Sequence, residues 1–275
     1  MKLAFVTGSN KGLGYGIIKR LAKFYSGEWD IYLTARNVER GQEAVEKLNK
    51  EGLSVKFHQL DITVPESRKE FLSYIAKNHP LGINVAVNNA GIAYKVNSTA
   101  PFGEQARVTV GTNFTSTVDF TEEFIPLLAA NARVVNVTGS IFLPSLKKMN
   151  KELYQKIRGP MTISELREFM AEFVKCAEDG TYSDKGWLPN AYAVSKLGLT
   201  KASQIFGDML KSDARRIIFN SCCPGYVNTE LTSHKGVKTI DEGADTPFYL
   251  ATLPPDAQIP INQFVYDRKV IAWCK

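Results

Sequence analysis

The sequence is poor in the features that mark membrane, secreted and metal-binding proteins. No stretch reaches the roughly 18 uninterrupted apolar residues of a membrane helix, and no small-residue cleavage site follows a longer apolar run near the amino terminus. The histidines are isolated. The cysteines are too few and too unevenly spaced for a disulfide framework or a metal site; they are Cys176, Cys222, Cys223 and Cys274. We therefore expect a cytoplasmic protein with reduced thiols, no metal and no membrane attachment.

Runs of like charge are also absent. The chain carries 34 Lys and Arg residues against 28 Asp and Glu residues, a net charge of +6 at pH 7. Such a balance could serve a nucleic acid, an acidic surface or a phosphorylated cofactor. The basic residues are scattered and no RNA-binding motif occurs, so we interpret them as solvated surface and expect no nucleic-acid partner.

The sequence does contain a regular alternation of short apolar runs with longer stretches of helical periodicity, in a chain of 275 residues with an ordinary globular composition. This pattern predicts an α/β fold with a doubly wound, seven-stranded parallel sheet. The predicted strands are residues 3–7, 31–34, 55–59, 85–88, 134–138, 217–221 and 263–265. The predicted helices are residues 14–24, 39–50, 65–78, 115–130, 193–210 and 240–252. Because no repeat or linker interrupts the chain, we expect a single domain over residues 1–275.

One segment, at about residues 146–187, departs from this alternation. It is polar, and between Ile163 and Phe173 its apolar residues recur at helix spacing. We interpret it as a helical insertion within the domain.

The first predicted strand leads directly into a glycine-rich turn, Thr7-Gly8-Ser9-Asn10-Lys11-Gly12-Leu13-Gly14. Glycines here permit a tight turn, a close approach of backbone N–H groups to a pyrophosphate and close packing of helix on strand. The helix amino terminus that follows adds partial positive charge. The turn could also be an ordinary strand-to-helix loop, but its position after the first strand favours dinucleotide binding.

The end of the second predicted strand indicates which dinucleotide binds. The strand ends Thr34-Ala35-Arg36-Asn37, without the carboxylate that would accept hydrogen bonds from the adenosine ribose of NAD. Arg36 can form charge-assisted hydrogen bonds to a 2′-phosphate, and Lys11 would add a second cation. Each could be a surface charge by itself, but together they favour NADP over NAD.

A second signal is the segment Tyr192-Ala-Val-Ser195-Lys196. Residues four apart share one helical face, so the Lys196 ammonium can lie close to the Tyr192 phenol. A nearby cation favours the phenolate. We therefore expect a lowered Tyr192 pKa that suits acid–base catalysis, although this spacing alone often occurs by chance.

In chain order, these motifs resemble those of the short-chain dehydrogenase/reductase family. The matching motifs are Thr7-Gly8-x-x-x-Gly12-x-Gly14, Asn88-Asn89-Ala90-Gly91, Asn113, Ser140, Tyr192-x-x-x-Lys196 and Pro224-Gly225. Within the family the chain is most similar to the monomeric NADPH-dependent carbonyl reductases, because of Asn10-Lys11-Gly12, Cys222-Cys223-Pro224-Gly225 and the long interval before Tyr192. The resemblance implies a Rossmann-type fold, NADPH/NADP as cofactor and a small-molecule carbonyl substrate. It also implies a monomer, since the inserted helices of those reductases cover the face that other members use for dimerisation.

The resemblance further implies roles for single residues. Tyr192 would be the proton donor, and Lys196 the cation that lowers its pKa and holds the nicotinamide ribose. Ser140 would bind the substrate oxygen, and Asn113 would hold a water that links Lys196 to solvent. The residues expected to bind the cofactor are Gly8, Asn10, Lys11, Gly12, Leu13, Gly14, Arg36, Asp61, Ile62, Asn89, Ala90, Gly91, Tyr192, Lys196, Pro224, Gly225, Val227 and Thr229; among them, Asp61 and Ile62 would lie by the adenine and Asn89 by the ribose.

Three points stay open. An ungapped match to related carbonyl reductases would put Gly139 at the serine position, so Thr138 is the alternative hydroxyl to Ser140. Residues 88–91 could be mainly architectural. Either Cys222 or Cys223 could be a reactive thiol or an inert buried one.

The expected reaction is hydride transfer from NADPH to a ketone, aldehyde or quinone, while Tyr192 protonates the oxygen. The alternatives are an NAD(P)-dependent alcohol or steroid dehydrogenase, and a catalytically idle NADP-binding sensor or scaffold. We expect residues 94–103, residues 229–239 and the insertion to line the substrate pocket. Candidate aromatic contacts, each of which could equally be ordinary packing, are Tyr94, Phe102, Phe142, Trp187 and Tyr226.

Overall fold

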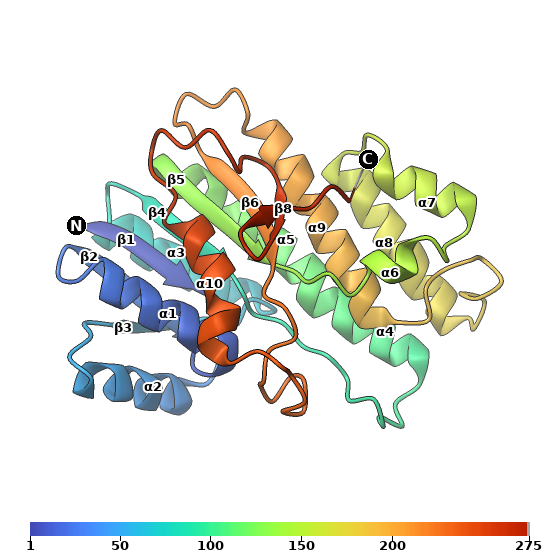
Figure 1. The fold of residues 1–275 in the computed structure, drawn as a ribbon, viewed down its shortest axis with the longest axis horizontal. Helices are drawn as coiled ribbons and strands as arrows, with labels where there is room; N and C mark the ends of the chain where they lie inside the picture. Colours follow the sequence, from blue (N-terminus) through green and yellow to red (C-terminus); the bar gives the residue numbers. More distant parts are fainter. Residues whose placement is uncertain (274–275) are drawn as a thin grey trace.

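The computed structural model describes residues 1–273, without the side chain of Ser145, so the expectation for Cys274 lies outside the described residues. Within this range the chain forms one eight-stranded sheet in the order β3-β2-β1-β4-β5-β6-β7-β8 (Figure 1). The strands are β1 (Lys2–Val6), β2 (Trp29–Ala35), β3 (Lys56–Gln59), β4 (Ile83–Asn88), β5 (Leu128–Val137), β6 (Ile218–Cys223), β7 (Phe264–Tyr266) and β8 (Lys269–Val270). Each of the predicted strands overlaps one of the first seven, and these pair in parallel.

The prediction of seven parallel strands is wrong by one strand, because β8 follows β7 as an antiparallel hairpin partner. The two residues between them, Asp267 and Arg268, have positive φ angles of 48° and 59°. Two-residue hairpin turns of this kind are recognised in sequences mainly by Asn-Gly or Asp-Gly pairs. The Asp-Arg pair carries no such signal.

Helices cover both faces of the sheet. They are α1 (Gly12–Phe24), α2 (Val38–Lys50), α3 (Pro65–Asn78), α4 (Phe102–Val110), α5 (Ser116–Phe124), α6 (Leu143–Leu146), α7 (Lys151–Arg158), α8 (Ile163–Glu178), α9 (Ala191–Met209) and α10 (Ile240–Ala251), with a π-helical turn η1 (Gly111–Thr115) and a 3-10 turn η2 (Ile125–Leu127). None of the helices within residues 1–273 combines the length and the apolarity that a membrane-crossing segment requires.

Alternating side chains of the strands divide the interior into two cores. In β1, Leu3 and Phe5 face the core that contains side chains of α3, α5 and α9. Ala4 and Val6 face the opposite core, with side chains of α1, α2 and α10. The period of two residues in a strand directs successive side chains to opposite faces, and since both faces are covered, central strands such as β1 carry apolar side chains on both of them.

The predicted helix at residues 115–130 is wrong at its carboxyl end. The structure has α5 only to Phe124, then η2, and β5 already begins at Leu128. Pro126 lacks a backbone N–H and cannot continue the helix. On the amino-terminal side the helical stretch is longer than predicted, because α4 and η1 run into α5 without a break.

The predicted insertion is helical and contains α7 and α8. Helix α8 begins at a capping box, in which the side chains of Thr162 and Glu165 each accept from the other residue's backbone N–H. Its apolar residues Leu166, Phe169 and Phe173 are fully buried. They hold α8 against α4 and α9 (Figure 1).

Candidate active site

A cavity of about 540 Å³ opens at the carboxyl ends of the parallel strands, between the glycine-rich turn and the loop after β6. Open α/β sheets bind ligands at this edge. Every residue of the predicted cofactor set lines this cavity. Of the other predicted site residues, Asn113 and Ser140 lie outside the lining, whereas Thr138 belongs to it. Between residues 1 and 273, no cluster of His, Cys, Asp or Glu side chains could hold a metal ion.

The glycine-rich turn is braced by Asn89, which follows β4. Asn89 Nδ2 donates to the carbonyl oxygens of Thr7, at 2.9 Å, and Gly8, at 3.1 Å. The backbone N–H groups of Asn89 and Ala90 both donate to Thr7 Oγ1 at 2.9 Å. A Cβ at Gly14 would lie 2.5 Å from Asn89 Nδ2, so only glycine fits there. The Asn89 amide therefore has the architectural role that the sequence left open, and its contact with a ribose stays a prediction.

Helix α1 begins directly at the cavity, with Gly12 at a positive φ of 56°. Its first turn contains no acidic residue, and no side chain caps its amino terminus. The first N–H groups of a helix have no partner inside the helix, and the helix dipole adds positive charge to them. This end of α1 can therefore bind the pyrophosphate of a dinucleotide.

Arg36 lines the cavity directly after β2 and is exposed. Lys11 forms an ion pair with Glu230, which lies in the loop after β6, and this pair lowers the pKa of the Glu230 carboxyl group. The Glu230 carbonyl oxygen also accepts from Lys95 Nζ. Sequence reasoning missed Glu230, since it stands 219 residues from Lys11 in the chain and no local pattern links them.

Tyr192 and Lys196 lie on one face of the first turns of α9, where Asn190 caps the helix through a bond from the Ala193 N–H. Lys196 is 4% exposed, and its Nζ lies 5.7 Å from the centre of the Tyr192 ring. Lys196 Nζ donates to the Val137 carbonyl oxygen at 3.0 Å. A Cβ at Gly91 would approach to 3.5 Å from Lys196 Nζ, so glycine leaves space in front of the ammonium.

Burial decides the pKa values of these two residues. It raises the Tyr192 pKa above its ordinary value, and the neighbouring Cys223 thiol adds to this shift. Burial also lowers the Lys196 pKa to about 8. The shift is therefore opposite to the expected lowering of the Tyr192 pKa, because burial disfavours the charged phenolate. Tyr192 keeps its proton at neutral pH.

Asn113 lies in the π-helical turn η1 and is fully buried. Its Oδ1 accepts from the Ile92 N–H at 2.8 Å, and its Nδ2 donates to the Ile92 carbonyl oxygen and to Ser195 Oγ. Single π-helical turns are frequent at functional sites. Here the turn directs the amide into the segment after β4, which lines the cavity, while a water held by Asn113 stays a prediction.

The hydroxyl groups after β5 have different surroundings. Ser140 Oγ accepts from Cys223 Sγ at 3.2 Å, and Thr138 Oγ1 donates to the Cys222 carbonyl oxygen at 3.2 Å. Cys222 is fully buried, and burial raises its pKa well above the ordinary value, so it is an inert thiol. Of the two thiols, the structure thus links that of Cys223 to a candidate catalytic hydroxyl, whereas Cys222 contacts Thr138 through its backbone carbonyl.

Of the expected substrate side, residues 229–232 and His234 line the same cavity. A second cavity of about 560 Å³ is lined by residues 92–95 and 97–99, among them Tyr94, and by Val108. No residue of the insertion, all of which the structure describes, lines either cavity, so it does not take the expected place in the pocket. Phe142 and Trp187 are buried in the core, so the alternative of ordinary packing applies to both. Phe102 packs against Tyr182, whereas Tyr226 is exposed.

Known proteins share this architecture. A family model described as short chain dehydrogenase matches residues 2–145. The chain is 46% identical to the Mus musculus protein named carbonyl reductase (NADPH) 1, with 98% of each chain covered. It is 42% identical to the Rattus norvegicus protein named carbonyl reductase (NADPH) 3, with 99% of this chain and 98% of that one covered. The solved structure of salutaridine reductase from Papaver somniferum has a TM-score of 0.85 at 27% identity and covers 97% of this chain and 100% of that one. The predicted fold class is confirmed.

Proposed function

Since the chain belongs to the short-chain dehydrogenase family, we propose that it is an NADPH-dependent reductase of carbonyl compounds: ketones, aldehydes and quinones. Its similarity to proteins named carbonyl reductases supports this reaction. The observation that carries the proposal is the position of the Tyr192 phenol beside Lys196, in a cavity lined by the whole predicted cofactor set. NADPH, when bound, supplies the hydride.

The residues around the cavity fit a phosphorylated dinucleotide. The amino terminus of α1 and the glycine-rich turn would hold the pyrophosphate. Arg36 and Lys11 would hold the 2′-phosphate, and residues 61 and 62 would lie by the adenine. Lys196 would hold the nicotinamide ribose, in the space that Gly91 leaves open.

Tyr192 acts as the acid in this proposal. Because burial raises its pKa, the phenol holds its proton through the neutral range and can donate it to the carbonyl oxygen as negative charge develops there. Ser140 would hold the substrate oxygen through its hydroxyl, with Thr138 as the alternative.

The test is NADPH consumption with a panel of ketones, aldehydes and quinones. Tyr192→Phe is expected to lose activity by about a hundredfold or more while it retains NADPH binding. Tyr154→Phe, in the insertion and away from the cavity, is the matched control and keeps wild-type turnover. Cofactor binding without turnover of any substrate would favour the idle sensor or scaffold. Full activity in Tyr192→Phe would exclude the proposed acid.

We also propose that the protein works as a cytoplasmic monomer. Helix α8 of the insertion packs along α4 and α9, the part of the fold that the resemblance associates with dimerisation in other members. The described cysteines are unpaired, which suits a reducing compartment. Sedimentation of the purified chain over a range of concentrations tests the monomer, and a dimer at micromolar concentration would contradict it.

A further inference from the structure

The turn at residues 61–63, directly after β3, lines the cavity and is held in place from α3. The Asp61 N–H donates to Ser67 Oγ at 3.0 Å. The Ile62 carbonyl oxygen accepts from Arg68 Nη1 at 2.9 Å. Within the turn, Asp61 Oδ1 accepts from the backbone N–H and the hydroxyl of Thr63. The shape of this part of the cavity therefore depends on side chains that lie behind it.

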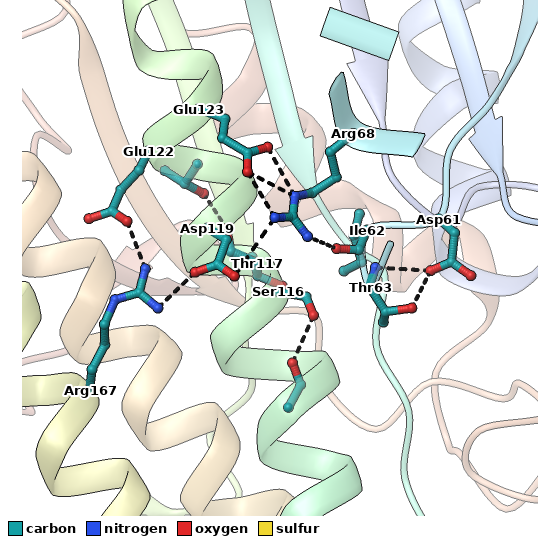
Figure 2. A network of polar contacts seen from close by, with 12 residues as sticks. Asp61, Ile62, Thr63, Arg68, Ser116, Thr117, Asp119, Glu122, Glu123 and Arg167 are labelled. Atoms are coloured by element: carbon teal, nitrogen blue, oxygen red, sulfur yellow. Dashed lines mark hydrogen bonds and ion pairs between the residues drawn. The ribbon is translucent and has the colours of Figure 1, made fainter. Parts of the chain in front are cut away.

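Arg68 is unusual among them because it is a cation that is only 5% exposed. A buried guanidinium must be paired to be tolerated, and Glu123 of α5 pairs with it in two places. Arg68 Nε lies 2.9 Å from Glu123 Oε2, and Nη2 lies 2.8 Å from Glu123 Oε1. A guanidinium is a rigid, planar fork. Once Glu123 holds two of its nitrogens, the third is directed at the Ile62 carbonyl oxygen, as Figure 2 shows.

A second arginine, Arg167, contacts helix α5 from the other side but does not reach the turn at residues 61–63. Arg167 of α8 contacts Asp119 and Glu122 of α5, each at 2.7 Å (Figure 2). Asp119 is also 3.8 Å from Arg68 Nη2. Within residues 1–273 no hydrogen bond joins Arg167 to residues 61–63. Arg167 thus offers a comparison: it shares the acidic partner Asp119 of α5 with Arg68 but lacks the contact with the cavity wall.

We propose that Arg68 is a positioning residue for the cofactor, which holds the turn at residues 61–63 in the conformation that binds the adenine end of NADPH. The proposal rests on the function proposed above. Without the bond to Ile62, the turn would spend part of its time in other conformations, and the apparent dissociation constant would rise in inverse proportion to the competent fraction. Tyr192 and Lys196 lie at the other end of the cavity lining and would be unaffected.

The experiment measures the dissociation constant for NADPH by titration calorimetry, together with the melting temperature, kcat and KM. Arg68→Met removes the donor to Ile62 and is expected to raise the dissociation constant and KM for NADPH by about tenfold. At saturating NADPH, kcat stays near the wild-type value. Glu123→Gln weakens the contact that directs the Arg68 fork at Ile62, so it is expected to raise the dissociation constant for NADPH, but by less than Arg68→Met. Arg167→Gln removes the ion pairs with Asp119 and Glu122 and leaves the contacts of Arg68 with Glu123 and Ile62 in place. It is expected to lower the melting temperature and to leave the dissociation constant within about twofold of wild type.

Equal weakening of NADPH binding in Arg68→Met and Arg167→Gln, in proportion to their loss of melting temperature, would overturn the proposal, because Arg68 would then serve only the stability of the fold. Unchanged affinity in a folded Arg68→Met protein would overturn it as well. Where Arg68→Met does not fold, Arg68→Lys keeps the charge beside Glu123 but cannot supply the fork, and the same comparison with Arg167→Gln applies. Wild-type protein that does not bind NADPH would instead refute the proposed function.

Discussion

Lys196 approaches Tyr192 over the face of its ring, with 5.7 Å between the ammonium nitrogen and the ring centre, and donates its described hydrogen bond to Val137 instead. The pair is therefore not a simple ammonium–phenolate contact. Burial keeps the phenol protonated and makes the ammonium the easier group to deprotonate. The consequences of this arrangement can be measured in solution.

The pH dependence of kcat/KM for NADPH should report Lys196. Its pKa is lowered to about 8, so the ammonium is present below that pH and is lost as pH rises through it. We expect kcat/KM to be constant below about pH 8 and to fall about tenfold per pH unit above it, if the charged lysine holds the ribose. This decrease of kcat/KM above about pH 8 cannot come from Tyr192, whose pKa is raised above about 10. A flat profile up to about pH 10 would contradict this assignment.

Arg36→Asp should change the cofactor preference. A hydrogen bond to a charged group contributes about 1.5–3 kcal/mol, so kcat/KM for NADPH should fall by about ten- to a hundredfold, while that for NADH should rise. Lys47→Asp makes the same change of charge in the last turn of α2, away from the cavity lining, and is expected to leave the ratio unchanged. The measurement is kcat/KM with both cofactors for wild type and both variants. No shift towards NADH in Arg36→Asp would undermine the choice of NADP.

Two glycine-to-alanine substitutions should have opposite effects. In Gly14→Ala the new Cβ would lie 2.5 Å from Asn89 Nδ2 and 2.8 Å from the Gly8 carbonyl oxygen. Overpacking of this kind costs about 1–3 kcal/mol of unfolding free energy, and displacing Asn89 would weaken NADPH binding. A Cβ at Gly111, in η1, would meet no atom within 4 Å. Gly111→Ala should therefore leave the free energy of unfolding unchanged or raise it by up to about 1 kcal/mol. Thermal unfolding and NADPH titration of both variants are the measurements that check this.

The stability of the fold should depend on His79 in mildly acidic solution. His79 is 6% exposed, and its Nε2 lies 3.0 Å from the Tyr32 hydroxyl. Burial lowers its pKa although Asp30 lies near, because Lys56 already engages that carboxylate at 2.6 Å. The unfolded chain therefore binds the proton more readily than the folded one. This contribution to stability is complete above about pH 6.5, the unfolded value, and is lost as pH falls below it.

Urea unfolding of wild type and His79→Gln between about pH 5 and pH 8 tests this. Glutamine can keep a hydrogen bond to Tyr32 but does not titrate, so the difference between the two proteins isolates His79 from the other histidines. The variant should lose less stability than wild type on acidification. Parallel profiles would mean that His79 does not contribute.

The parts of the fold that could be predicted depend on local patterns. The strand at residues 31–34 was recognisable because its side chains are apolar on both faces, and α8 because its buried residues recur at helix spacing. Pairings between distant residues have no such signature. Strand β8 depends on two positive φ angles at Asp267 and Arg268, which an Asp-Arg pair does not indicate. The end of α5 was missed because the apolar residues of β5 continue the helical pattern beyond Pro126.

The same division applies to the candidate site. The predicted cofactor residues belong to short motifs, and all of them line the cavity. Their electrostatics could not be predicted, since the Tyr192 pKa depends on how deeply the phenol is buried, which the spacing of Tyr192 and Lys196 does not reveal. Nor could Glu230 or Arg68 be found, because each acts on a segment that only the folded chain brings near.

The π-helical turn at residues 111–115 has a consequence for the phase of the two helices that it joins. A π turn holds one residue more than an α turn, and one residue corresponds to about 100° of rotation about the helix axis. Deleting a single residue there would let α4 and α5 merge into one regular helix but would rotate their apolar stripes out of step. The extra residue thus allows the apolar stripes of α4 and α5 both to face the interior, while the Asn113 carboxamide is directed from the turn towards Ile92.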